Sequence, residues 1–286
     1  MKFIDKISSL NAGHNITDDY LDTFCRINDG EGHYHYQNID YGGTFGTTTK
    51  GAKARMLQLT MDSQDCLCCY CMRKISIANQ EVTLEHIIPQ HCTKEDFELY
   101  MMKNVSPLTA NNVVRTADFT GKPNPDRTRR PHTVTYENLV ASCSGTFPDK
   151  GGTSQCCNNK RGDKRIYPMF YVATVNTQIS YMQDGTMLPD VNCLHADEFR
   201  ETIEHVRLNN TNLKDIRRLW HLLSQVDYEQ LKDCLINRTL RRETLMSVLF
   251  KDTEQSQQDF NISAKYTSND EYWRTFLLYR WFHRKI

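Results

Sequence analysis

Apolar residues recur every three or four positions through most of the last third of the chain. This spacing is typical of amphipathic helices and predicts three of them, over 196–208, 212–225 and 227–250. In the second helix, Leu213, Ile216 and Leu223 share the apolar face. A polar break over 251–263 precedes an aromatic and basic segment, 271–286, which we expect to form a helix that docks on the core. Binding of nucleic acid or of a partner is the alternative use of that segment.

Two runs of β-branched and apolar residues in the middle of the chain predict strands, over 82–88 and 133–143. A short helix is expected between them at 94–104, and a Pro- and Arg-rich loop follows it over 120–132. A further short helix is expected to follow the second strand, within 156–165. The middle of the chain therefore combines a pair of strands with short helices.

The N-terminal region is expected to begin with a helix that starts near Thr17 and runs to Asn28. Residues 33–53 are rich in Gly, Thr and Tyr and are expected to be extended. His33 and His35 alternate with tyrosines, so both imidazoles fall on one face of a strand. We interpret this as a polar strand face, with a metal site as the alternative.

Charge is balanced over the whole chain, which has a formal net charge of +0, whereas non-specific nucleic-acid binders usually carry a basic excess. The stretch 122–165 departs from this balance, with nine basic and four acidic residues. We interpret this excess as a solvated loop, and a basic face of a nuclease that relies on a partner or a second surface is the alternative. We expect no membrane span, because no apolar run approaches the roughly 20 residues that one requires. The N-terminus lacks the apolar segment of a signal peptide, so a cytoplasmic protein is expected.

The 11 cysteines indicate metal binding rather than disulfides, because their number is odd and no export signal is apparent. Cys68 and Cys71 have the C-x₂-C spacing that lets two thiolates of one turn reach a single Zn²⁺. The second pair is expected to be Cys143 with Cys157, and Cys156 is the alternative to Cys157. A four-cysteine zinc site has a structural role, because its coordination is closed to substrate.

A carboxylate and a histidine, Glu85 and His86, are expected at the end of the first strand, where Pro89 turns the chain away. Neighbouring strand residues point to opposite faces, so the two side chains need a local twist or bulge to serve one site. Cysteine-dependent catalysis through Cys69 or Cys92 is the weaker alternative, because no recognisable Cys/His signature accompanies them.

Four short motifs follow one another in a fixed order: CCYC at 68–71, LEHIIP at 84–89, YENLVASC at 136–143 and CNNKRGD at 157–163. Together they resemble the HNH (ββα-metal) endonucleases. Within that family they resemble the zinc-bearing, PtuB-like proteins of bacterial retrons and of the Septu anti-phage system. The resemblance covers roughly residues 66–165.

This resemblance implies an α+β fold with a ββα-metal HNH core, structural zinc knuckles and a helical C-terminal region. The corresponding domains are an N-terminal α/β extension over 1–60, the nuclease core over 61–170 and a mostly helical region over 171–286. The core would contain an insertion over 92–135. His91 and His132 lie within or beside this insertion and are expected to face solvent, with an approach to the metal as the alternative.

The resemblance also implies roles for single residues. His86 would be the general base that deprotonates the attacking water. Glu85 and Asn158 would offer oxygen ligands to a catalytic Mg²⁺ or Mn²⁺ ion, and Asn138 would brace the loop that orients His86.

Two features of the last motif complete these implied roles. Lys160 or Arg161 would contact a neighbouring phosphate. The long insertion between Cys143 and Cys157 departs from the family's usual spacing. The open choice between Cys156 and Cys157 also leaves open whether Asn158 or Asn159 is the third signature residue.

The function that follows from the resemblance is metal-dependent hydrolysis of nucleic-acid phosphodiester bonds, with DNA or RNA, including tRNA, as the polymer. Such a protein would be the toxic effector of an anti-phage defence system. It would act with a PtuA-like ATPase and, in some systems, with a retron reverse transcriptase and its DNA or RNA. The alternative is a zinc-stabilised module that binds nucleic acid or protein without catalysis.

Overall fold

The computed structural model describes the whole chain except residues 42–50, 80–81, 104, 106, 109–111, 123–126, 150–151, 226–240, 250–256, 280–281 and 283–286. The contacts divide the chain into two compact units, each assembled from three stretches of sequence. The first unit consists of Met1–Cys69, Ile75–Cys143 and Arg161–Asn176. The second unit consists of Tyr70–Lys74, Ser144–Lys160 and Thr177–Ile286. These units do not follow the three consecutive segments expected from the sequence, because each of them joins distant stretches of chain.

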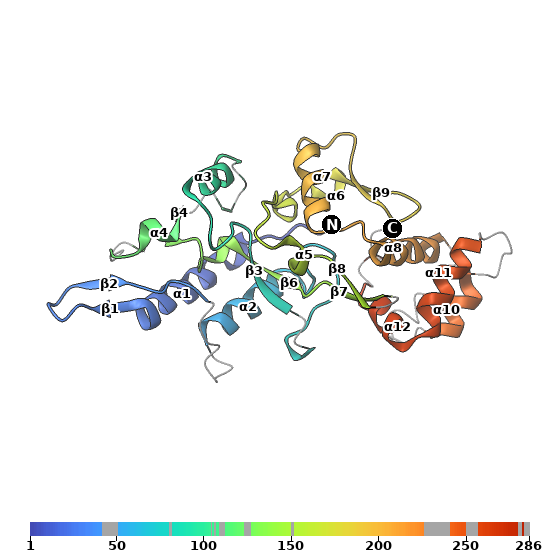
Figure 1. Cartoon of the computed structure of the whole chain (residues 1–286), viewed down its shortest axis with the longest axis horizontal. Helices are drawn as coiled ribbons and strands as arrows, with labels where there is room; N and C mark the ends of the chain where they lie inside the picture. Colours follow the sequence, from blue (N-terminus) through green and yellow to red (C-terminus); the bar gives the residue numbers. More distant parts are fainter. Residues whose placement is uncertain are drawn as a thin grey trace. The chain divides into compact units, whose positions relative to one another are not determined.

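The centre of the first unit is an antiparallel pair of strands, β3 (Val82–His86) and β6 (Leu139–Cys143). Leu84 lies opposite Ala141, and His86 lies opposite Leu139. Helices α1 (Leu10–Tyr20) and α2 (Ala52–Ser63) pack against each other, and α2 lies beside β6 (Figure 1). The strand pair therefore has a helical layer that covers it.

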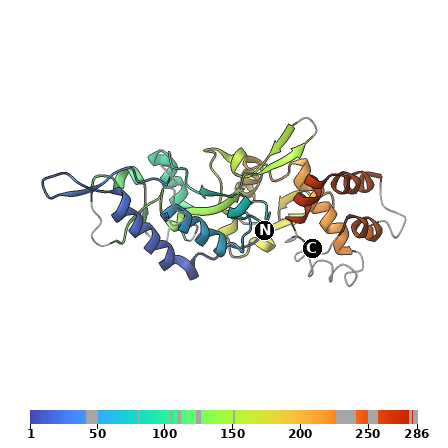
Figure 2. The same cartoon turned by 90° about the horizontal axis from the view of Figure 1, so that it is seen from below.

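Several shorter elements complete the first unit. The β1–β2 hairpin projects from its end (Figures 1 and 2), and β4 pairs in parallel with β5. The strands are β1 (Arg26–Asn28), β2 (Tyr34–Tyr36), β4 (Val113–Val114) and β5 (Arg130–Pro131). The helices and single turns are η1 (Ile7–Ser9), η2 (Leu21–Cys25), η3 (Ile77–Asn79), α3 (Lys94–Met102), α4 (Thr116–Phe119), η4 (Tyr136–Asn138) and η5 (Met169–Tyr171).

The second unit combines two hairpins with a group of helices. Its strands are β7 (Thr146–Asp149), β8 (Gly152–Gln155), β9 (Ile179–Tyr181) and β10 (Met187–Pro189). The helices are α7 (Ala196–His205), α8 (Thr211–Gln225), α10 (Arg242–Leu249), α11 (Gln257–Ser268) and α12 (Asp270–Leu277). Two single turns, α5 (Asn158–Arg161) and α6 (Val175–Gln178), stand where the chain passes from one unit to the other. Trp220 of α8 stacks on Phe276 of α12 with ring centroids 4.6 Å apart, which places aromatic rings at the core of the helices.

Among the described residues the sheets are five separate two-stranded pairs beside many helices, so the expected α+β class is confirmed at this level. The expected helices at 94–104, 196–208 and 212–225 and the short helix after Cys157 are present. Most of the helix expected over 227–250 lies outside the described residues, which include α10 at its end. No helix in the described part of the chain is long and apolar enough to cross a membrane.

Several expected boundaries are wrong, including the end of the first helix, because Arg26–Asn28 forms strand β1. The first helix begins at Leu10 rather than near Thr17, whose buried hydroxyl donates to the Gly13 carbonyl within the helix. The second strand is confined to Leu139–Cys143, because the residues before it form a turn and η4. Helix α11 begins inside the expected polar break, because several of its residues pack against α8.

Candidate functional site

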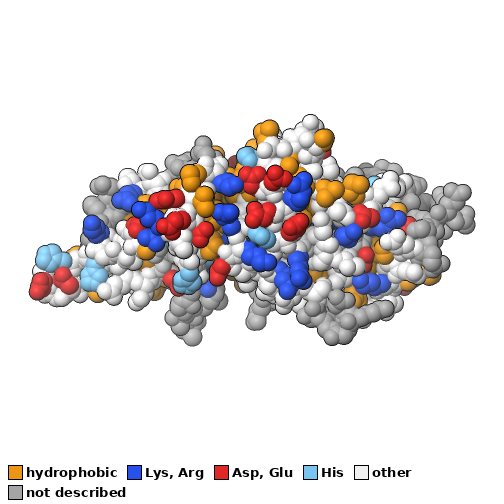
Figure 3. Space-filling view, turned by 45° about the horizontal axis from the view of Figure 1, so that its top comes forward, with side chains coloured by type: hydrophobic (Ala, Val, Ile, Leu, Met, Phe, Trp, Pro, Cys, Tyr) orange, Lys and Arg blue, Asp and Glu red, His pale blue; other side chains and the backbone are white. Residues whose placement is uncertain are grey.

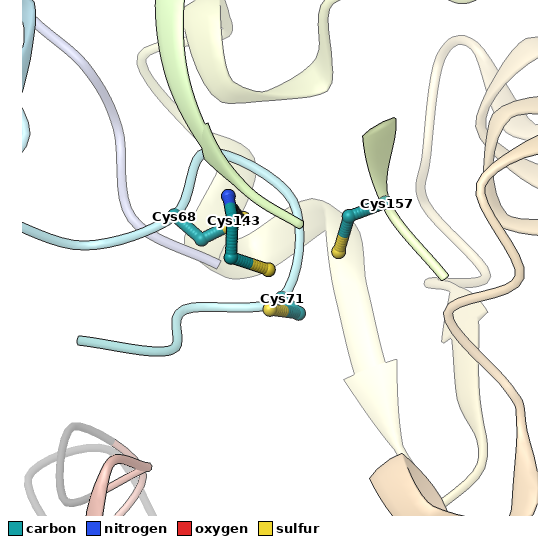
Figure 4. A group of neighbouring side chains, drawn as sticks. All are labelled: Cys68, Cys71, Cys143 and Cys157. Carbon is teal, nitrogen blue, oxygen red and sulfur yellow. Dashed lines mark hydrogen bonds between the residues drawn. The ribbon is translucent and has the colours of Figure 1, made fainter. Parts of the chain in front are cut away.

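Four cysteines from separate stretches of the chain lie together, with sulfur atoms that are all within 4.8 Å of one another. They are Cys68, Cys71, Cys143 and Cys157, and all four are buried (Figure 4). Cys68 and Cys71 belong to the turn that follows α2, Cys143 ends β6, and Cys157 directly precedes α5. Because buried, closely spaced thiols without disulfides match the tetrahedral donor set of structural zinc, the residues fit a zinc ion.

Hydrogen-bond donors approach two of these sulfur atoms. The Cys143 backbone N–H points at the Cys68 sulfur over 3.4 Å, and the Tyr279 hydroxyl lies 3.5 Å from the Cys71 sulfur. Donors of this kind stabilise thiolate charge and orient metal ligands. The cluster therefore has features beyond mere proximity that favour a bound cation.

The sequence left open whether Cys156 or Cys157 is the fourth cysteine of the cluster, and the structure places Cys157 there. Cys157 has a left-handed backbone conformation with φ of 52°, and its N–H donates to the Val206 carbonyl. The chain therefore turns at this residue. Cys156 is buried outside the four-sulfur set, although its sulfur lies 3.3 Å from that of Cys157.

His86 ends β3 with a half-buried imidazole whose Nε2 lies 2.8 Å from the Thr133 carbonyl oxygen. Burial lowers the pKa of His86 to about 4, so the ring is neutral at pH 7. A carbonyl oxygen only accepts hydrogen bonds, so Nε2 carries the proton and Nδ1 has the lone pair. The local fold thus selects the tautomer of His86 that has Nδ1 as its basic atom.

Asn138 ties the segment after His86 to the loop that contains Thr133. Its side chain is fully buried, and its Oδ1 accepts a hydrogen bond from the Ile88 N–H at 2.7 Å. Its Nδ2 donates to the Ile88 carbonyl at 3.0 Å and to the His132 carbonyl at 2.8 Å. One amide side chain therefore satisfies three backbone groups on two segments.

Glu85 is paired with Arg161 inside the protein. The two side chains are 8% and 1% exposed, and Arg161 Nη1 lies 2.5 Å from Glu85 Oε1. The same guanidinium donates to the carbonyls of His86 and Ile87. Arg161 is therefore not available as the exposed phosphate contact that the sequence predicted, because its buried guanidinium binds Glu85 and the backbone carbonyls at the end of β3. The neighbouring Lys160 is half-buried.

The remaining predicted residues occupy different surroundings. Asn158 is the first residue of α5 and is half-buried, whereas Asn159 is exposed and lies 3.3 Å from the Thr146 hydroxyl. His91 is exposed, as expected. His132 is only 1% exposed, so the expectation that it faces solvent is wrong.

The surroundings of His132 also weigh against cysteine-dependent catalysis. Its Nδ1 accepts the Thr116 backbone N–H at 2.9 Å, so the proton of the neutral ring lies on Nε2. That nitrogen lies 3.1 Å from the Pro89 carbonyl and 3.5 Å from the Cys92 sulfur. A protonated nitrogen cannot take the thiol proton, and burial raises the pKa of Cys92. Cys92 is therefore not an activated nucleophile.

The basic stretch is only partly a surface feature. Arg127 pairs with Asp22, and Arg130 makes two hydrogen bonds with Asp18, so these charges are locally balanced. Lys150 lies outside the described residues. On the face drawn in Figure 3, Lys and Arg side chains lie among Asp and Glu side chains rather than forming one continuous basic patch.

A second group of potential metal ligands lies at the exposed tip of the β1–β2 hairpin. Asp29, Glu31 and His33 have ligand atoms within 4.8 Å of one another, and His33 Nδ1 lies 3.2 Å from the Asp29 carboxylate. The alternation with tyrosines had predicted only His33 and His35 as a pair, without the two acidic residues. The alternation of Asp, Glu and His with glycine over 29–33 is the signal that marks them.

No protein-family model matches the chain, and no curated protein matches it. The residues and their geometry alone therefore carry the functional inference.

Proposed function

We propose that this protein is a metal-dependent endonuclease of the HNH (ββα-metal) type, with His86 as its general base. The observation that carries the proposal is the fixed ring of His86, which is neutral at pH 7 and has its Nε2–H bonded to the Thr133 carbonyl. Strand β3 pairs with β6, and the short helix α5 follows β6 in the chain after the β7–β8 hairpin, so a strand pair is followed by a helix as in a ββα unit. The four-cysteine cluster is the expected structural companion of that unit.

In the proposed reaction His86 takes a proton at Nδ1 from the water that attacks phosphorus. The Thr133 carbonyl accepts the Nε2–H throughout, so it keeps the ring oriented and stabilises the imidazolium that forms. A bound phosphate anion near the ring raises the pKa of His86 from its low value toward neutrality, which makes it a stronger base when substrate is present. Asn138 holds the backbone at Ile88 and the backbone at His132 in fixed positions.

The proposed catalytic ion is Mg²⁺ or Mn²⁺, which prefers oxygen ligands, and Glu85 and Asn158 would hold it. When bound, such an ion stabilises negative charge on the phosphate as a Lewis acid. Arg161 already neutralises one oxygen of Glu85, so the ion would have to share this carboxylate with a guanidinium. Zinc in the cysteine cluster would remain structural, because four thiolates leave no open position.

The biological role that we propose follows the motif order rather than the geometry. The order of the four motifs resembles the PtuB-like effectors of retron and Septu defence systems. We therefore propose a toxic effector that acts with a PtuA-like ATPase and, in some systems, with a retron reverse transcriptase and its DNA or RNA. Either DNA or RNA, including tRNA, can be the substrate, because an attacking water does not require a 2′-hydroxyl.

The test is a cleavage assay with the purified full-length chain. Plasmid DNA, single-stranded DNA and total tRNA are offered separately with Mg²⁺ or Mn²⁺, with and without the neighbouring ATPase. His86→Ala is expected to abolish cleavage, whereas the exposed His91→Ala is expected to cleave like the wild type. Equal cleavage by His86→Ala and wild type would reject His86 as the base.

A zinc-stabilised binding module is the second candidate, and the buried Glu85–Arg161 pair favours it. A carboxylate that is committed to a guanidinium is a poorer ligand for a divalent ion than an open carboxylate. This candidate predicts that the wild type and His86→Ala bind nucleic acid equally in a gel-shift assay and that neither cleaves it. Divalent-dependent cleavage by the wild type would exclude it.

A further inference from the structure

The loop that orients His86 is itself held by the N-terminal helix α1. Residues 130–138, which we call the positioning loop, contribute both the Thr133 carbonyl that receives His86 and the Asn138 amide. Helix α1 packs against the end of this loop, at η4. The loop that orients His86 therefore contacts a helix that lies more than a hundred residues before that loop in sequence.

Two contacts between α1 and the positioning loop involve nearly buried side chains. The Asp18 carboxylate accepts hydrogen bonds from Arg130 at 3.0 and 2.8 Å, in the bidentate geometry that fixes both partners. The Thr17 hydroxyl donates to the Val134 carbonyl at 3.0 Å, directly beside the carbonyl that faces His86. The helix thus engages both the side chains and the backbone of the loop.

The third contact is a hydrogen bond between His14 and Glu137, the residue next to Asn138. His14 Nε2 lies 2.5 Å from Glu137 Oε1, and the Thr135 hydroxyl donates to the other carboxylate oxygen at 2.6 Å. The Glu137 side chain is completely buried, and its backbone carbonyl accepts from the Tyr171 hydroxyl at 2.9 Å. Burial raises the pKa of Glu137, but the hydrogen bonds from His14 and Thr135 outweigh it and hold the pKa below its ordinary value. The carboxylate is therefore ionised at neutral pH.

We propose that His14 and Glu137 are positioning residues for His86, an inference that rests on the proposed function. Glu137 is covalently joined to Asn138, whose amide holds the His132 carbonyl next to Thr133. Loss of the His14 contact leaves the buried Glu137 carboxylate with one fewer hydrogen-bond donor. The loop then shifts so that this carboxylate accepts a hydrogen bond from another donor. The Thr133 carbonyl then moves, and His86 loses its single tautomer and orientation.

The test compares three variants of the full-length chain that change only α1. His14→Ala removes the donor to Glu137, and His14→Gln keeps a donor at the corresponding position. Asp19→Asn is the matched control. Asp19 lies on the same helix as His14, and the substitution removes an exposed ion pair with Arg55 of α2 without touching the loop. Thermal unfolding and zinc content verify that each variant is folded.

We expect His14→Ala to lower kcat about 10- to 100-fold with KM changed less than about threefold, because small displacements of a catalytic group cost this much. His14→Gln is expected to recover the rate to within about threefold of wild type, and Asp19→Asn is expected to match it. Nitrogen NMR of the imidazoles is the readout that does not need activity. It is expected to show His86 as the Nε2-protonated tautomer in the wild type and as a mixture of tautomers in His14→Ala.

The two proposals fail in different ways. An unchanged His86 ring spectrum in folded His14→Ala would overturn the positioning role, whatever the cleavage rate. A changed ring spectrum in a chain that cleaves no nucleic acid would support the positioning role and overturn the nuclease proposal alone.

Discussion

Replacement of Asn138 by aspartate is a nearly isosteric change with a large expected cost. The new side chain still accepts the hydrogen bond from the Ile88 N–H, but it can no longer donate to the carbonyls of Ile88 and His132. An ionised oxygen would instead face both carbonyl oxygens at the positions where Nδ2 now lies 3.0 and 2.8 Å from them. The site thus exchanges two attractive contacts for two repulsive ones in a fully buried location.

The expected magnitude follows from the two carbonyls that lose their donor. Each buried group left without a partner costs about 1 to 3 kcal/mol, so the substitution is expected to lower the free energy of unfolding by about 2 to 6 kcal/mol at pH 7. This is a large share of the roughly 5 to 15 kcal/mol that stabilises an ordinary domain.

The cost is also expected to depend on pH. Burial and the facing carbonyls raise the folded-state pKa of the introduced carboxyl above its unfolded value of about 3.9. For a group with a raised folded-state pKa, stability is lost as the pH rises from the unfolded pKa to the folded pKa. The Asn138→Asp deficit is therefore smallest in acid and grows toward neutral pH.

Urea unfolding of the zinc-loaded chain at several pH values measures this deficit directly. Asn159→Asp is the matched control, because it makes the same change at an exposed position and is expected to shift stability by less than about 0.5 kcal/mol. An Asn138→Asp variant as stable as that control at pH 7 would refute the bracing role of the Asn138 amide.

Three further predictions concern separate parts of the site. Because burial lowers the pKa of His86 to about 4, its basic form persists above that pH, so kcat/KM for any cleavage should fall only below about pH 4; a fall already near pH 6.5 would contradict this. Cys157→Ser is expected to lose zinc, measured by elemental analysis, whereas Cys156→Ser is expected to keep about one ion per chain; equal loss would place Cys156 among the ligands. Gly13→Ala puts a Cβ 2.3 Å from the ring of Tyr136 and is expected to lower stability by about 1 to 3 kcal/mol in urea unfolding; an unchanged midpoint would show that α1 is not closely packed there.

The sequence predicted those parts of the site that depend on local pattern. The C-x₂-C spacing of Cys68 and Cys71 identified half of the metal cluster, and the β-branched run before His86 identified β3. The amphipathic spacing of 212–225 likewise identified α8, because the residues of one apolar helix face recur every three or four positions within a single segment. Such features require only near neighbours in the chain.

Features that depend on distant residues were not predictable in the same way. Arg161 looked like a surface cation until its pairing with Glu85, 76 residues away, placed it in the interior. His132 looked like a solvent-facing residue, because nothing local shows that Thr116 and Pro89 enclose it. Two adjacent cysteines do not reveal which sulfur joins the other three, and the folded chain places Cys157 among them.

The central claim is that His86 activates a water for metal-dependent cleavage of nucleic acid. The most direct measurement is the cleavage rate of purified wild type and His86→Ala on the same DNA and tRNA substrates, each with Mg²⁺ or Mn²⁺ and with excess chelator, at matched zinc content. If His86 is the general base, the wild type is expected to show cleavage that requires the added ion and is lost in His86→Ala. Cleavage that persists in His86→Ala, or a zinc-loaded wild type that cleaves neither polymer even with its ATPase neighbour, would contradict this claim.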